Sequence, residues 1–479
     1  MKLKDFGRAV MTAATIIPLA VSPVYAQEDT RTEAQKALAG TEVRFLQPSM
    51  PQFAALGKFI PEFEEKYGIK VIVDEIPFDQ YRQKSLVEMQ QGTGAYDLYA
   101  VDVMWLAEYA AAGFLDPLMP YVKNEGLTDA GYDIDDFLPR VISGTGVFND
   151  TLYTIPLGAG PVGTTFRADL AELAGFKLPD RFSPEFNTDY MYEAAKKVHN
   201  PESGVIGFAN VPGRWFWGVT WLQYLYAFQK PENVGNEYLD KDWKITINNP
   251  DTVASIDYFV KLKEFMPADS ANWGIGEATA VYQAGGAFGT WNYQDFINGF
   301  FEDPAAQATV AGKNVHLHTP AGPHGVIDPW FGAWSFGMSK DSKNKEAAWV
   351  FVQWVTSKEI QERATEFGAG PSRHSTYKSE TLAKFQPWWI PVYDFMLTTT
   401  NPDERARIPE WAEISDIMGQ EGSRVWIGEI DAATAAANME TAMTEAMKRG
   451  GYYIPGRTDL PKQLWRDLTY YDRLPSEWN

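Results

Sequence analysis

Strand-like and helix-like patterns alternate, with short connections, through the first quarter of the chain. Residues 43–46 form a short apolar run, and apolar side chains then recur at helical spacings across 53–67. A β-branched run follows at 69–73, a second helical pattern at 78–91, and a further apolar run at 97–101. Because a strand, a helix and a parallel strand connect as a right-handed crossover, this order predicts an open, mainly parallel α/β sheet.

The ends of the predicted strands point to a binding site. In an open α/β sheet, ligands bind outside the carboxyl ends of the strands. The first strand ends at Gln47 and Ser49, and the strand at 97–101 ends at Asp102, so these side chains are expected at the mouth of a site. Asp102 also precedes Trp105, which starts the next helical pattern and is a further ligand candidate. An N-cap of that helix is an alternative role for Asp102 that can coexist with ligand binding.

The rest of the chain continues the same α/β character and then becomes helical. Pro61 predicts a kink or break in the first helix. A Gly/Pro-rich segment at 155–161 would let backbone approach a ligand, and a second α/β pattern occupies 162–310. A clear helical pattern covers 345–356, and the chain beyond Tyr377 is largely helical. A length of 479 residues is enough for two lobes of unequal size, each with its own core.

The N-terminal segment has the pattern of a secretory signal. Basic residues precede an apolar stretch at 9–21, and small residues stand near a cleavage position after Ala26. We therefore expect residues 1–26 to be a signal peptide that is removed. No later apolar run approaches the ~20 residues of a membrane span. The chain has no cysteine that could be lipidated, so the sequence predicts a free periplasmic protein.

Charge and cysteine content exclude several classes of function. The chain has 42 Lys and Arg against 63 Asp and Glu, a formal net charge of −21. Nucleic-acid and anionic-membrane partners need basic patches, so neither is expected. The absence of cysteine excludes disulfides, thiolate metal sites and a cysteine nucleophile.

The sequence displays no set of residues typical of catalysis or metal binding. His316, His318 and His324 lack a carboxylate at a helical companion spacing, and the acidic run at 133–136 lacks the glycine and glutamate of a calcium loop. No phosphate-binding glycine loop or nucleophile elbow is present. We expect no metal, no cofactor and no catalytic residue. A secreted carbohydrate-active enzyme, a hydrolase or lyase, stays open as the alternative, since any acidic chain offers carboxylate pairs.

Aromatic residues are unusually frequent and are grouped. The 17 Trp, 23 Tyr and 28 Phe include clusters at 214–221, 291–293 and 330–334. Tryptophan rings stack on the C–H faces of sugars, while carboxylates, amides and arginine bind the hydroxyls. Trp217 and Trp221 share a helical face and are expected in the core. The ligand candidates in these clusters are Arg214, Trp215, Trp291, Asn292, Trp330 and Trp334.

A series of short segments, in order along the chain, carries a resemblance to a known family. The segments are 63–71, 96–102, 113–118, 152–156, 282–288, 344–349 and 370–373. Together they resemble the extracellular solute-binding proteins of bacterial ABC importers, family 1, the maltodextrin-binding-like group.

The resemblance implies the periplasmic binding protein fold, type II-like, with two α/β lobes hinged around an open or closed cleft. It implies a discontinuous N-terminal lobe of residues 41–118 and 316–339. The C-terminal lobe would then comprise 119–315 and 340–479, ending in a helical extension. Crossings between the lobes are expected near 118–121, 315–319 and 337–340.

The resemblance also implies ligand contacts at Gln47, Ser49, Asp102, Trp291, Trp330, Trp334 and Arg373. For Arg373 a salt bridge with a surface acid is an alternative. We expect a periplasmic, monomeric substrate-binding protein that captures a sugar, polyol or sugar derivative and delivers it to an ABC permease. No bond is broken in this process, so the prediction is that the chain is not an enzyme.

Overall fold

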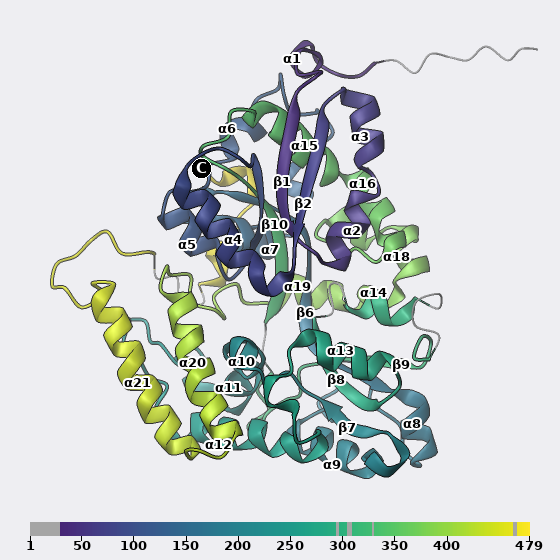
Figure 1. Cartoon of the computed structure of the whole chain (residues 1–479), viewed down its shortest axis with the longest axis vertical. Helices are drawn as coiled ribbons and strands as arrows, with labels where there is room; N and C mark the ends of the chain where they lie inside the picture. The colour runs from purple at the N-terminus through teal and green to yellow at the C-terminus, as the bar shows by residue number, and fades with distance from the viewer. Residues whose placement is uncertain (1–28, 294–296, 304–308, 328–329, 463–466) are drawn as a thin grey trace, which may run out of the picture.

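A single mixed β-sheet runs through both halves of the molecule. The structure, a computed structural model, describes residues 29–293, 297–303, 309–327, 330–462 and 467–479, and the predicted signal peptide at 1–26 lies outside the described residues (Figure 1). The sheet has the strand order β2-β1-β3-β10-β6-β8-β7, with β9 paired to β6. The upper half in Figure 1 holds the first strands of the chain, and the lower half holds β7, β8 and β9.

The upper half forms as the sequence pattern predicts. Strands β1 (Glu42–Pro48), β2 (Lys70–Ile76) and β3 (Leu98–Asp102) pair in parallel. The predicted first helix is broken into α2 (Pro51–Gly57) and α3 (Ile60–Tyr67), because Pro61 stands at the start of α3 and cannot donate the hydrogen bond that would continue α2. Up to residue 146, this half also contains α1 (Glu33–Ala37), α4 (Phe78–Gln91), α5 (Leu106–Ala111), α6 (Met119–Val122) and α7 (Pro139–Gly146).

Strand β6 (Thr154–Arg167) connects the two halves. Its first part pairs with β10 (Phe331–Met338), which lies antiparallel beside β3. Its second part pairs with β8 (Ala287–Tyr293) and β9 (Asn314–His318). The Gly/Pro-rich segment at 155–161 is thus part of the strand that passes between the halves.

The lower half places helices around β6, β7 (Ile206–Ala209), β8 and β9. Strand β7 runs parallel to β8. The helices described here are α8 (Ala168–Leu173), α9 (Thr188–Val198), α10 (Arg214–Thr220), α11 (Leu222–Phe228), α12 (Pro250–Lys261), α13 (Ile275–Gln283) and α14 (Ile297–Glu302).

The two-residue strands β4 (Val147–Phe148) and β5 (Thr151–Leu152) form a hairpin in the upper half. Single 3-10 turns lie at Ile134–Asp136, Pro201–Ser203, Pro231–Asn233, Leu262–Phe265, Ser270–Asn272, Thr365–Phe367, Pro387–Val392 and Pro475–Glu477.

The hydrophobic cores divide the chain differently from the predicted lobes. One core gathers buried residues from 43–157 and 334–369, together with Trp478, and the other gathers residues from 162–330 and 408–452. The prediction assigned 119–157 and α15 (Lys345–Val355) to the C-terminal lobe, but both pack in the first core. The reason is that β10 pairs with β3 and with the first part of β6, which brings these flanking segments into the upper half.

The C-terminal region forms a helical pair and then returns to the upper half. Helices α20 (Trp411–Trp426) and α21 (Ala432–Arg449) pack beside α10 and α12, at the lower left of Figure 1. From there the chain reaches Trp478, which is buried in the first core. The other helices are α16 (Lys358–Ala364), α17 (His374–Tyr377), α18 (Glu380–Phe385), α19 (Tyr393–Thr398) and α22 (Leu468–Tyr471), of which α17 to α19 contribute to a third, smaller core. In the described part of the chain, no helix combines the length and apolarity that crossing a bilayer requires.

Small residues allow α20 to lie close to α10. A Cβ atom added at Gly419 would stand 2.1 Å from the Arg214 carbonyl oxygen, and one at Gly422 would stand 2.0 Å from the Trp217 ring. Any larger residue at these positions would force the helices apart. Glycine therefore sets the position of the C-terminal helices against the lower half.

Candidate functional site

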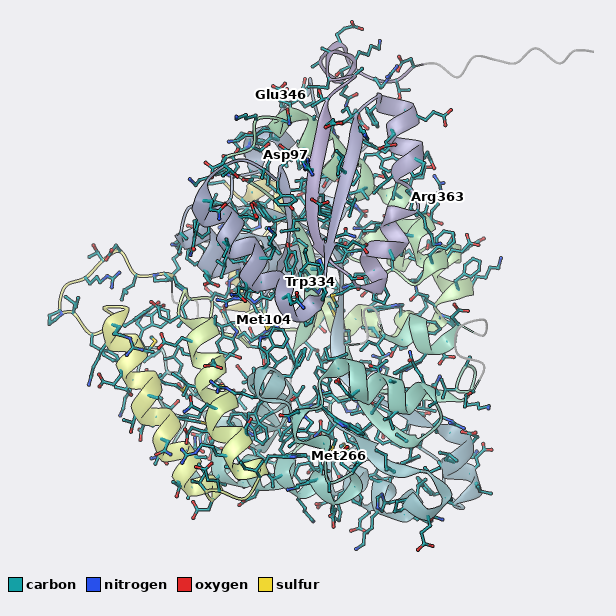
Figure 2. All side chains as sticks on the ribbon, viewed as in Figure 1. Asp97, Met104, Met266, Trp334, Glu346 and Arg363 are labelled. Carbon is teal, nitrogen blue, oxygen red and sulfur yellow. The ribbon has the colours of Figure 1, made fainter. Side chains whose placement is uncertain are left out.

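A cavity of about 200 Å³ lies between the two large cores. The upper half contributes its walls from α4 and the segment before α5, and the lower half contributes α10 and α20. Figure 2 labels Met104, a wall residue, near the level at which the two halves meet. The lining residues are Arg82, Met104, Trp105, Trp215, Val219, Trp411, Ala412, Ser415 and Asp416.

The chain topology explains this location. The parallel strands β2 and β3 end immediately before Phe78 and at Asp102, so their carboxyl ends lead into the junction. The Phe78 ring lies edge-on to Trp215 of the lower half, with ring centroids 5.2 Å apart, and stacks with Phe216 at 6.0 Å. The expectation that a site lies at the carboxyl ends of the strands agrees with the position of this cavity.

Aromatic side chains form the wall on the side of the upper half. Trp105 lines the cavity, and its ring meets Trp334 edge-on with centroids 5.4 Å apart. Tyr81 stacks on Trp105 at 5.9 Å and donates its hydroxyl hydrogen to the Ala100 carbonyl oxygen. Trp334, labelled in Figure 2, is only 3% exposed and supports Trp105 from behind. The structure thus brings together two predicted site residues, and one of them reaches the cavity.

Asp102 is held at the end of β3 in a buried position. Its Oδ1 atom accepts a hydrogen bond of 3.0 Å from the Met104 backbone N–H, so it closes a local turn. It does not cap α5, because the residue at the N-cap position is Trp105. Burial raises the pKa of this carboxyl to about 6, although the positive charge of Arg405 acts in the opposite direction.

Two ion pairs flank the cavity. Arg82 Nη2 lies 2.8 Å from each carboxylate oxygen of Glu108. Across the cavity, Arg214 Nη2 donates to both carboxylate oxygens of Asp416, at 3.1 and 3.0 Å. Arg214 was predicted to contact the ligand, but its guanidinium pairs with Asp416, and it is Asp416 that lines the cavity. Trp215, also predicted, lines the cavity and is 44% exposed.

The predicted residues Trp291, Asn292 and Trp330 lie together but do not line this cavity. The two indole rings are 6.1 Å apart and both are buried in the second core. The Arg405 guanidinium lies 4.9 Å from the Trp330 ring centroid. Asn292 donates a hydrogen bond of 2.9 Å to Asn298 Oδ1 and is fully buried. In this structure these three residues are buried in the lower half of the molecule and do not reach the cavity.

Gln47 and Ser49 are also absent from the walls of this cavity. Gln47 is buried, and its side-chain amide donates to Glu75 Oε1 at 2.9 Å. It borders a separate cavity inside the upper half, together with Phe45 and Phe53. Ser49 is exposed and its backbone N–H donates to the Ile76 carbonyl oxygen, so the local role of this residue is to hold β1 to β2.

Arg373 is a structural residue rather than a residue of the cavity, which corrects the prediction. Its side chain is fully buried. The guanidinium donates to the Thr356 carbonyl oxygen and to the Asp133 carbonyl oxygen, each at 2.8 Å, and lies 3.4 Å from Asp136 Oδ2. It also stacks over Phe137 at 3.7 Å. The alternative was a salt bridge with a surface acid; the structure has an ion pair, but its acid, Asp136, is only 10% exposed. The contacts leave the guanidinium no access to a solute.

Sequence reasoning missed the contribution of α20. Trp411 and Ser415 are four residues apart and therefore lie on one face of α20, as do Ala412 and Asp416. The tryptophan and its helical spacing were visible in the sequence. The packing of this helix on α10, which directs the face into the junction, was not.

His316 and His318 take part in hydrogen bonds within the protein. His316 Nε2 lies 2.9 Å from Glu302 Oε1, and Nδ1 lies 2.9 Å from Thr165 Oγ1. His318 Nδ1 accepts from the Phe182 backbone N–H. Among the described residues, no group of three or more histidine and carboxylate side chains is placed to hold a metal ion.

Comparison with known proteins identifies the family. The family model for bacterial extracellular solute-binding proteins matches residues 47–362 of this chain. The chain belongs to this family. Its relatives are binding proteins, several of them named as parts of ABC transporters, and not enzymes, which agrees with the prediction that this solute-binding protein breaks no bond.

Two curated relatives cover most of the solute-binding protein. The erythritol/L-threitol-binding protein of Mycolicibacterium smegmatis is 27% identical over 402 residues, which is 78% of this chain and 80% of the relative. The mannitol-binding protein of Pseudomonas aeruginosa is 26% identical over 430 residues, 84% of this chain and 92% of the relative.

Solved structures confirm the predicted fold. An ABC transporter solute-binding protein from Agrobacterium radiobacter K84, in complex with ribitol, has a TM-score of 0.76 and 26% identity, and the match covers 86% of this chain and 99% of that one. A second solute-binding protein, from Agrobacterium vitis S4 with bound D-mannitol, has a TM-score of 0.75 at 23% identity, over 86% of this chain and 100% of the other. The prediction of the two-lobe periplasmic binding protein fold is therefore confirmed.

Proposed function

We propose that this protein captures a sugar alcohol or a closely related small sugar in the cavity between its lobes and delivers it to the permease of an ABC importer. The observation that carries the proposal is that both lobes supply the walls of one cavity with aromatic and hydroxyl-binding side chains. Trp105 comes from one side, and Trp215 and Trp411 come from the other. Ser415 and Asp416 supply polar atoms in the same cavity.

The chemistry and size of the cavity support a small polyhydroxy solute. Indole faces pack against C–H groups of a polyol, and carboxylate and hydroxyl oxygens accept hydrogen bonds from its hydroxyls. A volume of about 200 Å³ is below the roughly 300–1,000 Å³ of sites for drug-sized ligands. This favours one small solute over an oligosaccharide. The erythritol/L-threitol-binding, mannitol-binding and ribitol-bound relatives point to the same class of solute.

We propose that the lobes correspond to the two large cores, with β6 and β10 as the connecting strands. A solute that contacts both walls would stabilise the closed arrangement, and the permease would recognise that arrangement. The contacts of Phe78 with Trp215 and Phe216 already join the two lobes beside the cavity. Closure would therefore need to order only the solute and the side chains around it.

We further propose that residues 1–26 direct export to the periplasm and that the protein acts there as a monomer. The membership in an extracellular solute-binding family and the basic and apolar N-terminal pattern support the first point.

The experiment is a thermal-shift and calorimetric screen of the purified protein against erythritol, ribitol, D-mannitol, their parent sugars and maltose. A ligand at 100 times its Kd stabilises the native state by about 2.7 kcal/mol, so a true solute gives a clear rise in Tm. The expected result is binding of at least one sugar alcohol with no chemical change of the solute. Turnover of a solute, or the absence of binding to every sugar alcohol and sugar, would overturn the proposal.

A further inference from the structure

The charged side chains around the cavity are already paired with opposite charges of the protein. Among the described residues that line the cavity, Arg82 and Asp416 carry charge. Arg82 binds Glu108 through both carboxylate oxygens, at 2.8 Å each. Asp416 binds Arg214 through both of its oxygens as well, at 3.1 and 3.0 Å. Each wall therefore presents a neutralised pair instead of a free charge.

The same holds for the charges behind the cavity. Arg405 borders an adjoining small cavity with Met104 and Trp411, and its Nε atom lies 3.2 Å from Glu404 Oε2. Its Nη2 atom donates to the Phe331 carbonyl oxygen at 2.6 Å. Asp102, which is 7% exposed, interacts electrostatically with the positive charge of Arg405. The Arg405 guanidinium behind the cavity is therefore paired, and the buried carboxyl of Asp102 does not itself line the cavity.

Recognition of an anionic solute would require a cation that is free to bind it. A carboxylate or phosphate group is held by arginine through paired, charge-assisted hydrogen bonds. The Arg214 guanidinium could donate such paired hydrogen bonds, but it already donates them to the Asp416 carboxylate. A second carboxylate placed beside Asp416 would meet a like charge at short range, and solvent screens this repulsion only in part at low ionic strength, although the Asp416 and Arg214 side chains are 61% and 54% exposed.

We infer that Asp416 is a specificity-determining residue that makes the cavity selective for neutral polyhydroxy solutes over the corresponding sugar acids, because it neutralises Arg214. This inference rests on the proposed function and adds the charge class of the solute to it. It also assigns a role in selectivity to α20, which lies outside the residues matched by the family model.

The test compares matched neutral and acidic solutes. The probes are erythritol, ribitol and D-mannitol, each with the aldonate of the same carbon skeleton: erythronate, ribonate and mannonate. Calorimetry at pH 7.5 and low ionic strength gives the ratio of Kd for each aldonate to Kd for its alditol. For the wild-type protein we expect a ratio of at least ten for the alditol that binds most tightly.

Three variants then test Asp416. Asp416→Asn leaves Arg214 without its carboxylate and should lower the ratio at least fivefold. The double variant Arg214→Gln/Asp416→Asn removes the freed guanidinium and should restore the ratio of the wild-type protein. Glu62→Gln is the control, because Glu62 forms a bidentate pair with Arg363 outside the cavity, at 3.0 and 2.8 Å, and its side chain is 47% exposed against 61% for Asp416. It should leave the ratio within twofold of that of the wild-type protein.

The outcomes separate this inference from the proposed function. If alditols bind and their aldonates bind as tightly or more tightly, the inference is overturned and the proposed function stands. If neither class nor any sugar binds, the proposed function itself fails. If Asp416→Asn leaves the ratio unchanged, or if Glu62→Gln lowers it equally, Asp416 does not determine selectivity. If the double variant keeps the lowered ratio, the part assigned to Arg214 is overturned.

Discussion

Replacing Asp102 with asparagine is expected to stabilise the solute-free protein at neutral pH. The carboxyl of Asp102 is 7% exposed, and burial raises its pKa from 3.8 to about 6. A pKa difference of about 2 corresponds to about 3 kcal/mol of unfavourable free energy for the charged form in the folded state. Asparagine carries no charge, and its Oδ1 atom can still accept the hydrogen bond from the Met104 backbone N–H.

The pH dependence of this effect has a definite sign. Between pH 4 and 6 the folded state holds the Asp102 proton more tightly than the unfolded state does, so stability decreases as pH rises through this range. Below about pH 3 the carboxyl is protonated in both states, and the cost of burying its charge disappears. The advantage of Asp102→Asn should therefore be only about 0.5 kcal/mol at pH 4 and reach about 3 kcal/mol, as an upper bound, above pH 6.5.

The assay is urea unfolding of the wild-type and variant proteins at pH 4, 5.5 and 7.5, because the difference between the two proteins cancels the contributions of all other carboxyl groups. Asp242→Asn, at a site where the side chain is 74% exposed, is the control and should stay within about 0.5 kcal/mol at each pH. A variant that is less stable than the wild-type protein at pH 7.5, or a difference independent of pH, would refute the reasoning. We also expect weaker solute binding, since a carboxylate acceptor is lost.

Three further substitutions test the site and its support. Trp215→Ala should weaken solute binding by about 1–2 kcal/mol through lost stacking, with little change in Tm. Tyr453 is an exposed aromatic residue outside the cavity, so the control Tyr453→Ala should leave the Kd measured by calorimetry unchanged. Gly422→Ala places a Cβ 2.0 Å from the Trp217 ring, so it should lower the free energy of unfolding by about 1–3 kcal/mol and weaken solute binding as α20 moves. Gly57→Ala, whose Cβ meets nothing within 4 Å, is the neutral control. Equal stability of the two variants would contradict this account of α20. Arg373→Met breaks a buried pair with Asp136, so it should lower the free energy of unfolding by about 3–5 kcal/mol. The relative affinities for neutral and acidic solutes should not change. A shift in solute preference with unchanged Tm would instead place Arg373 in the binding site.

The edge of the sheet at which the site lies can be located from local sequence patterns, but most residues of the site cannot. Apolar runs and helical spacings in the first hundred residues define parallel strands, and parallel strands place their carboxyl ends at one edge. Asp102 stands at the end of β3 as predicted, and Trp105 lines the cavity, while its contact with a solute stays a prediction. Trp215 was predicted because it comes directly after a loop and does not lie on the apolar face of the following helix.

The errors arise where the partner of a side chain is distant in sequence. The sequence shows that Arg373 is an arginine in a family segment, but its neighbours Asp133 and Asp136 lie about 240 residues away and are brought to it only by folding. The placement of α15 in the first core depends likewise on the antiparallel insertion of β10 between β3 and β6. Local periodicity gives the buried face of a helix and contains no information on which surface covers that face.

The amino-acid sequence by itself determined the α/β class and the clusters of aromatic side chains, because secondary structure depends on hydrogen bonding and side-chain spacing within a short segment. The solute-binding function followed from the resemblance of several segments to a known family. Only the tertiary structure decided which residues form the cavity. The close contact of α10 with Gly419 and Gly422 directs Trp411, Ser415 and Asp416 into the junction. That contact depends on the shapes of two helices about 200 residues apart, which no local pattern specifies.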